Sequence, residues 1–123
     1  MPVPAPIRRR CQDLLEPGEQ LGYLIPVTAV WLGAVMAGID CYVAVTDRRI
    51  AVLTGSPVRR GGPTEVNLQY PRTTRLGPVD FGPGPTFRLG KRSYEIEDEY
   101  VAAVHAADAE LDGLLPEDPF PDV

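Results

Sequence analysis

The chain has 123 residues and a formal net charge of −5, which is enough for one domain with a single modest core and too little for two. Hydrophobic residues make up 44% and charged residues 24%, so the composition excludes a wholly disordered chain. Fourteen prolines and twelve glycines predict frequent turns between many short strands, because both residues are depleted inside helices and strands.

The first segment, "PIRRRCQDLLEPGE", predicts a short helix that begins after Pro6 and ends at Pro17. Its arginines are followed by polar and acidic residues, and not by the apolar region of a signal peptide. Cys11 and Cys41 are too few for a disulfide framework and lack the spacing of a zinc site. We therefore expect reduced thiols, no bound metal and a cytoplasmic protein.

The next segment, "EQLGYLIPV", reads as a first strand and opens a long uncharged stretch. The nineteen residues 21–39 carry no charge, a count that would allow a helix to span a bilayer. Glycines and Pro26 interrupt this stretch, and Asp40 leads into a strand instead of a basic flank. We expect a strand followed by an apolar loop or short helix, with a transmembrane helix as the alternative.

The segment "VAVTDRRIAVLT" at 43–54 predicts a hairpin, because β-branched residues alternate with smaller ones on both sides of a polar turn. Asp47 is expected to hydrogen-bond the backbone of that turn. Arg48 and Arg49 then project from the end of the hairpin. They have two possible roles: they bind a partner, or they pair with acidic residues of the same chain and hold the barrel closed.

Further strands and a helix follow. "TEVNLQY" alternates as a half-buried strand, and "PTFRLG" and "SYEIED" predict two strands joined through Gly90 and Arg92. "RTTRLGPVDFG" has the composition of a further short strand and turn. An apolar stripe from Ile96 to Leu111 predicts a terminal helix that ends near Gly113. The expected organisation is an N-terminal segment at 1–12, a domain at 13–112 and an acidic, proline-rich tail at 113–123.

These segments also resemble a known family. "LLEPGEQ" ahead of "YVAVTDRRIAVL", and "RLGKRSYEI" leading into "YVAAVHAADAEL", are similar to the bacterial pleckstrin-homology-like domains, including small actinobacterial members. The resemblance covers about residues 13–112 and implies a seven-stranded barrel or bent sandwich capped by the C-terminal helix. It also implies that the Asp47–Arg49 turn joins the second and third strands. Some members of this family bind lipids or proteins.

Charge and side-chain chemistry limit the classes of function that the sequence allows. Residues 48–92 carry a net charge of +7 and residues 93–123 a net charge of −10, which suggests two faces with different partners or a tail that screens the middle. His105 is the single histidine, and it has no recognisable nucleophile, base or phosphate-binding loop beside it. We expect no catalysis and no cofactor. The low isoelectric point of about 4.8 and the few aromatic residues in the basic middle argue against nucleic-acid binding.

The sequence therefore predicts a non-catalytic binding module that recognises a protein partner or a second copy of itself, with an anionic membrane surface as a further candidate target. The alternative is a peripheral lipid-binding domain at the inner face of the membrane, regulated by its acidic tail. The candidate basic patch consists of Arg48, Arg49, Arg59, Arg60, Lys91 and Arg92. The candidate apolar contact consists of Val30, Trp31, Leu32, Val35 and Met36.

Overall fold

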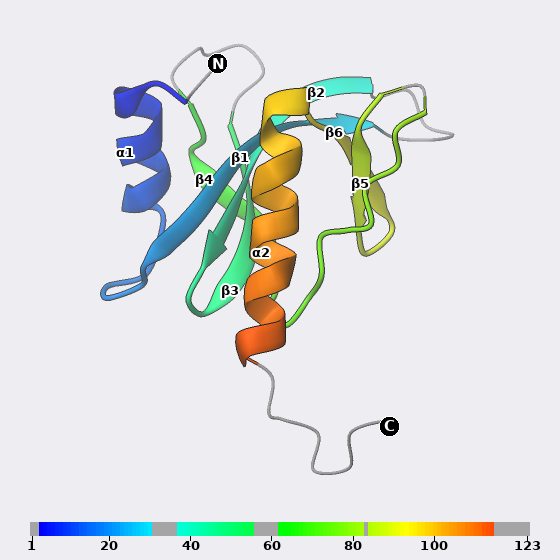
Figure 1. Cartoon of the computed structure of the whole chain (residues 1–123). Coiled ribbons are helices and arrows are strands. Elements are labelled where there is room, and N and C mark those ends of the chain that lie inside the picture. The colour runs from blue at the N-terminus through cyan, green and yellow to red at the C-terminus, as the bar shows by residue number, and fades with distance from the viewer. Residues whose placement is uncertain (1–2, 31–36, 56–61, 83, 115–123) are drawn as a thin grey trace.

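The computed structural model describes residues 3–30, 37–55, 62–82 and 84–114, which form one curled antiparallel sheet with two α-helices and a short 3₁₀ helix (Figure 1). The sheet has six strands in the order β4-β3-β2-β1-β6-β5. The strands are β1 (Leu21–Val30), β2 (Ala37–Thr46), β3 (Arg49–Thr54), β4 (Glu65–Pro71), β5 (Thr86–Leu89) and β6 (Arg92–Glu95). The helices are α1 (Ala5–Asp13), the short 3₁₀ helix η1 (Asp98–Tyr100) and α2 (Val101–Leu114).

The sheet curls at β1, because different parts of this strand pair with β2 and with β6. Along most of its length β1 pairs with β2, whereas only Thr28, Ala29 and Val30 pair with β6. A side-chain hydrogen bond also connects the two edge strands, β4 and β5. The Tyr70 hydroxyl donates a hydrogen bond to the carbonyl of Leu89 at 3.4 Å, so β4 contacts β5 without backbone pairing between them.

The main core lies on the inner face of the sheet, which we define as the face that α2 covers. Alternate residues of β1, β2 and β3 point into it, as the two-residue period of a strand requires. On α2 the buried residues are Val104, Ala107 and Leu111, which belong to the predicted stripe. The buried core residues of the strands are Ile25, Val27, Ala29, Cys41, Val43, Val45, Ile50, Val52, Phe87, Leu89 and Tyr94.

Helix α1 packs on the opposite, outer face. Cys11 is fully buried against a cluster formed by Leu24, Ala44, Ala51 and Leu53. The small side chains of the two alanines leave room for a helix to approach the sheet closely. The N-terminal segment is thus packed into the same body as the strands.

The mainly-β class with a short N-terminal and a longer C-terminal helix is confirmed. Three local expectations were wrong. Parts of the uncharged stretch that were expected as loop or helix extend β1 to Val30 and begin β2 at Ala37. The segment 72–82 contributes only an isolated bridge from Asp80 to Thr86. The regular helix starts at Val101, after η1, because Ile96 still belongs to the buried end of the sheet region.

Candidate functional site

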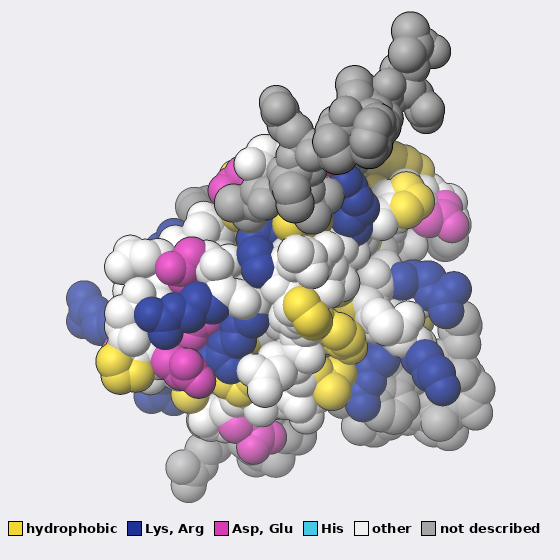
Figure 2. Space-filling view, turned by 90° about the horizontal axis from the view of Figure 1, so that it is seen from below, with side chains coloured by type: hydrophobic (Ala, Val, Ile, Leu, Met, Phe, Trp, Pro, Cys, Tyr) yellow, Lys and Arg dark blue, Asp and Glu magenta, His cyan; other side chains and the backbone are white. Residues whose placement is uncertain are grey.

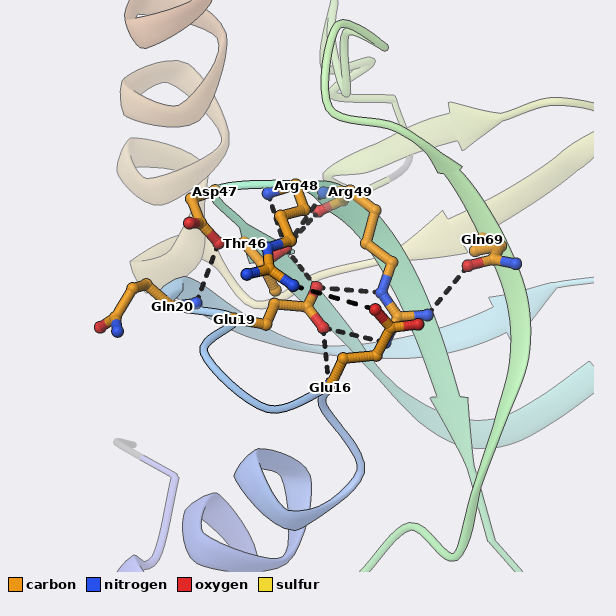
Figure 3. Close-up of polar contacts among 8 residues, drawn as sticks. All are labelled: Glu16, Glu19, Gln20, Thr46, Asp47, Arg48, Arg49 and Gln69. Carbon is orange, nitrogen blue, oxygen red and sulfur yellow. Dashed lines mark hydrogen bonds and ion pairs between the residues drawn. The ribbon is translucent and has the colours of Figure 1, made fainter.

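The predicted turn at the end of the β2–β3 hairpin is part of a hydrogen-bonded network centred on Glu19 (Figure 3). The side chain of Glu19 is fully buried, in the loop before β1. Arg49 donates from Nε to Glu19 Oε2 at 2.9 Å and from Nη2 to Oε1 at 3.0 Å. Thr46 Oγ1 donates to Oε2 at 2.6 Å, and the amide of Glu16 donates to Oε1 at 3.0 Å. Each carboxylate oxygen therefore accepts two hydrogen bonds.

Thr46 organises the turn, whereas Asp47, which was expected to do so, forms its hydrogen bond outside the turn. Thr46 Oγ1 accepts hydrogen bonds from the amides of Arg48 and Arg49 at 3.1 and 3.0 Å, so the threonine hydroxyl organises the turn. Asp47 Oδ1 instead accepts from the amide of Gln20 at 2.9 Å. It therefore ties the hairpin to the loop before β1 instead of bonding its own turn.

The network lowers the pKa of Glu19 despite the burial of its side chain. Desolvation raises the pKa of this carboxyl, but hydrogen bonds from Arg49, Thr46 and the Glu16 amide outweigh it and lower the pKa from 4.5 to about 2. The same carboxylate raises the pKa of Arg49. Arg49 therefore pairs with an acidic residue of its own chain, which is the second of the two roles predicted for it. That residue is Glu19, in the loop before β1.

Arg48 lies in this turn, whereas the other described members of the predicted basic patch, Lys91 and Arg92, lie at the β5–β6 turn. Arg48 Nη1 lies 3.9 Å from Glu16 Oε2, and both side chains are at least half exposed. Lys91 is exposed in the β5–β6 turn, and Arg92 donates from Nη1 to Asn67 Oδ1 at 3.4 Å. Figure 2 shows one face of the molecule, on which the Lys and Arg side chains form separate groups with apolar and uncharged surface between them. Arg59 and Arg60 lie outside the described residues.

The predicted apolar contact surface is described only at Val30. This residue is half-buried at the end of β1, where it pairs with Ser93 of β6 and Ala37 of β2. Trp31, Leu32, Val35 and Met36 lie outside the described residues. Within the part of the chain that the structure describes, no helix is long and apolar enough to cross a membrane.

A feature that the sequence did not predict is a cleft of about 320 Å³ where β6 separates from β1. We call it the acidic cleft because three carboxylates line it. They are Asp40 of β2, Glu95 of β6 and Glu97. The other lining residues are Pro26, Val27, Thr28, Cys41, Tyr42 and Ile96.

The sheet register places two of these carboxylates in one row on the outer face. Asp40 pairs with Thr28, and Thr28 pairs in turn with Glu95. Directly paired residues project to the same side of a sheet, and two strand spacings separate Asp40 from Glu95 by about 10 Å. Thr28 Oγ1 donates to Asp40 Oδ1 at 3.5 Å. The threonine thus lies between two exposed acids.

The charged groups that line the acidic cleft are carboxylates. Burial and the nearby Asp40 raise the pKa of Cys41, so its thiol is a poor nucleophile at neutral pH. Among the described residues, no group of His, Cys, Asp and Glu has the arrangement of a metal site. Carboxylates at the rim of an open cleft attract ammonium and guanidinium groups.

The sequence offered little signal for this site. Asp40 stood out as the end of the uncharged stretch, and Glu95 and Glu97 belonged to the predicted strand "SYEIED". Only the pairing of β1 with both β2 and β6 brings them to one place.

We compared the chain with models of protein families, with curated proteins and with solved structures, and none of these matches it.

Proposed function

We propose that this protein is a non-catalytic binding module of pleckstrin-homology-like fold whose acidic cleft binds a positively charged segment of a protein partner. The observation that carries this proposal is the meeting of Asp40, Glu95 and Glu97 in one cleft. The curled sheet with a helix across its inner face supports the fold assignment. Thr28 and Asp40, which line the cleft, flank in the sequence the residues of the candidate apolar contact.

The charge state of the cleft favours a cationic partner. Asp40 and Glu95 are exposed, and no Lys or Arg within the described ranges forms an ion pair with either of them. Two carboxylates without a cation raise the local concentration of positively charged groups. Pro26 and Tyr42 add apolar surface beside them, as at the centre of many protein interfaces.

The second candidate function is binding to an anionic membrane surface, regulated by the acidic tail. Exposed Arg48, Arg88 and Lys91 favour it, since each cation near an anionic surface contributes about 1 kcal/mol. The β2–β3 hairpin contributes less than the sequence suggested, because Glu16 and Glu19 lie against its two arginines.

The test measures binding of a short arginine-rich peptide and of a glutamate-rich peptide of equal length by calorimetry at two salt concentrations. We expect binding of the cationic peptide alone, weaker at high salt. Asp40→Asn/Glu95→Gln should weaken it at least tenfold. The control Glu65→Gln/Asp112→Asn, which removes the same charge at exposed positions outside the cleft, should not.

A parallel measurement with anionic and neutral vesicles addresses the second candidate. Equal binding of the two peptides, or cationic-peptide binding that is unaffected by Asp40→Asn/Glu95→Gln, would reject the acidic cleft as the site. Binding to anionic vesicles that is lost in Arg88→Ala/Lys91→Ala would then favour the membrane function.

A further inference from the structure

The outer face of the sheet carries a basic surface next to the acidic cleft. Helix α1 packs on this face through Ile7 and Cys11, and Arg8, Arg9 and Arg10 are exposed. Because successive helix residues are turned by about 100°, three consecutive arginines cover most of the circumference that Ile7 and Cys11 leave free. We call this surface the arginine ridge.

Tyr42 marks the border between the two surfaces. Its side chain packs against the cluster that contains Cys11 of α1, and it also lines the acidic cleft. The arginine ridge and the acidic cleft are therefore neighbours on one face of the molecule. Within the described residues, no carboxylate forms an ion pair with Arg8, Arg9 or Arg10.

Two adjacent surfaces of opposite charge make the outer face self-complementary. A two-fold axis near their border would set the ridge of one copy against the cleft of the second copy, and the reverse contact would form at the same time. The exposed carboxylates of Asp40 and Glu95 in the cleft are the groups that the arginines of the ridge can meet. Guanidinium groups bind carboxylates through paired hydrogen bonds and are enriched at protein interfaces.

We propose that the chain forms a two-fold homodimer in which the arginine ridge of each copy occupies the acidic cleft of the other. This inference rests on the proposed function of the cleft and names a second copy of the chain as the cationic partner. Pro26 and Tyr42 lie at the centre of the contact. The charged groups surround them and fix the relative orientation of the two copies.

Reversing the charge of one surface at a time tests the dimer. Each reversed surface then carries the same charge as the surface that it should contact. In the acidic variant, Arg8→Glu/Arg9→Glu/Arg10→Glu, the ridge becomes negative like the cleft. In the basic variant, Asp40→Lys/Glu95→Lys, the cleft becomes positive like the ridge. Each variant alone repels itself, so its dimer dissociation constant should rise about 100-fold. An equimolar mixture of the two should form a one-to-one heterodimer, since both of its contacts are complementary.

Sedimentation velocity from about 1 µM to about 1 mM, with a fluorescent label on one variant, measures these states. The side chains of Arg8, Arg9 and Arg10 are exposed on α1 and glutamate is a good helix former, so the acidic variant is expected to keep its fold. Thermal unfolding checks this for each variant. If a reversed variant does not fold, Arg8→Gln/Arg9→Gln/Arg10→Gln and Asp40→Asn/Glu95→Gln replace the pair, and each should weaken the dimer about tenfold. The control Arg88→Glu/Lys91→Glu reverses charges outside both surfaces and should leave the dimer unchanged.

The outcomes separate this inference from the proposed function. A wild-type chain that stays monomeric over the whole range and binds the cationic peptide overturns the dimer and leaves the cleft as a binding site for another protein. A dimer that withstands both reversals also overturns the inference. A monomer that does not bind the cationic peptide overturns the dimer and the proposed function together.

Discussion

Glu19 and Arg49 are joined by two hydrogen bonds, 2.9 Å from Nε to Oε2 and 3.0 Å from Nη2 to Oε1, although 30 residues separate them along the chain. The pair connects the loop before β1 to the turn between β2 and β3. The charges are almost hidden from solvent, with 15% of the Arg49 side chain and none of the Glu19 side chain exposed. A pair in such a place holds the hairpin in position and leaves Arg49 with little capacity to bind a partner.

Replacing Glu19 tests the strength of this connection. Glu19→Gln leaves the Arg49 guanidinium without its counter-charge in a nearly buried site, so we expect the free energy of unfolding to fall by about 3 kcal/mol. Urea denaturation measures the change. Glu16→Gln is the matched control, because the exposed pair of Glu16 with Arg48 contributes less than about 1 kcal/mol. Equal effects of the two substitutions would contradict the central position of Glu19.

The same carboxyl makes stability depend on acid pH. The pKa of Glu19 is about 2 in the folded chain against an ordinary value of 4.5, so the folded state favours the ionised form. This contribution to stability is complete at pH values above 4.5 and is lost as the pH falls toward 2. Urea midpoints between pH 6 and about pH 2.5 should fall more steeply in the wild type than in Glu19→Gln. Parallel curves for the two proteins would show that the pKa of Glu19 is not lowered.

Asp108 anchors α2 to the segment after β4. Its Oδ1 accepts a hydrogen bond from the amide of Leu76, and its Oδ2 accepts one from the amide of Gly77, both at 2.8 Å. Asp108→Ala leaves both amides without their acceptor, so we expect a loss of about 2 kcal/mol in the free energy of unfolding. The control Asp112→Ala removes only an exposed pair with Arg75 and should cost less than about 1 kcal/mol. A wild-type melting curve for Asp108→Ala would show that this anchor contributes nothing.

Gly90 shapes the β5–β6 turn where it meets β4. Its φ angle is +60°, and a Cβ atom at this position would lie 3.1 Å from the Tyr70 hydroxyl oxygen. Gly90→Ala should therefore lower the free energy of unfolding by about 1–2 kcal/mol and displace Tyr70. Gly82→Ala is the control, because a Cβ atom there meets nothing within 4 Å. Fluorescence or NMR signals of Tyr70 that are identical in Gly90→Ala and the wild type would contradict the contact.

The sequence alone determined the elements whose residues repeat with a local period. Alternation of apolar residues with small or polar ones placed β3, β4 and the second half of β2, because every second side chain of a strand enters the core. Val104 and Leu111 fell on the buried stripe of α2 for the same reason at helical spacing. The turn at Thr46–Arg49 was also visible, since its polar residues interrupt two apolar runs.

Tertiary structure decided which distant groups meet. Arg49 could have faced a partner or an acid of its own chain, and only the folding of the loop before β1 onto the hairpin makes Glu19 its partner. Asp40 and Glu95 are brought together by the register of two different strand pairs with Thr28. Local periodicity predicts which face of a strand a residue occupies. Which strands are neighbours, and in which register they pair, depends on the packing of the whole sheet. The acidic cleft is therefore a product of that packing.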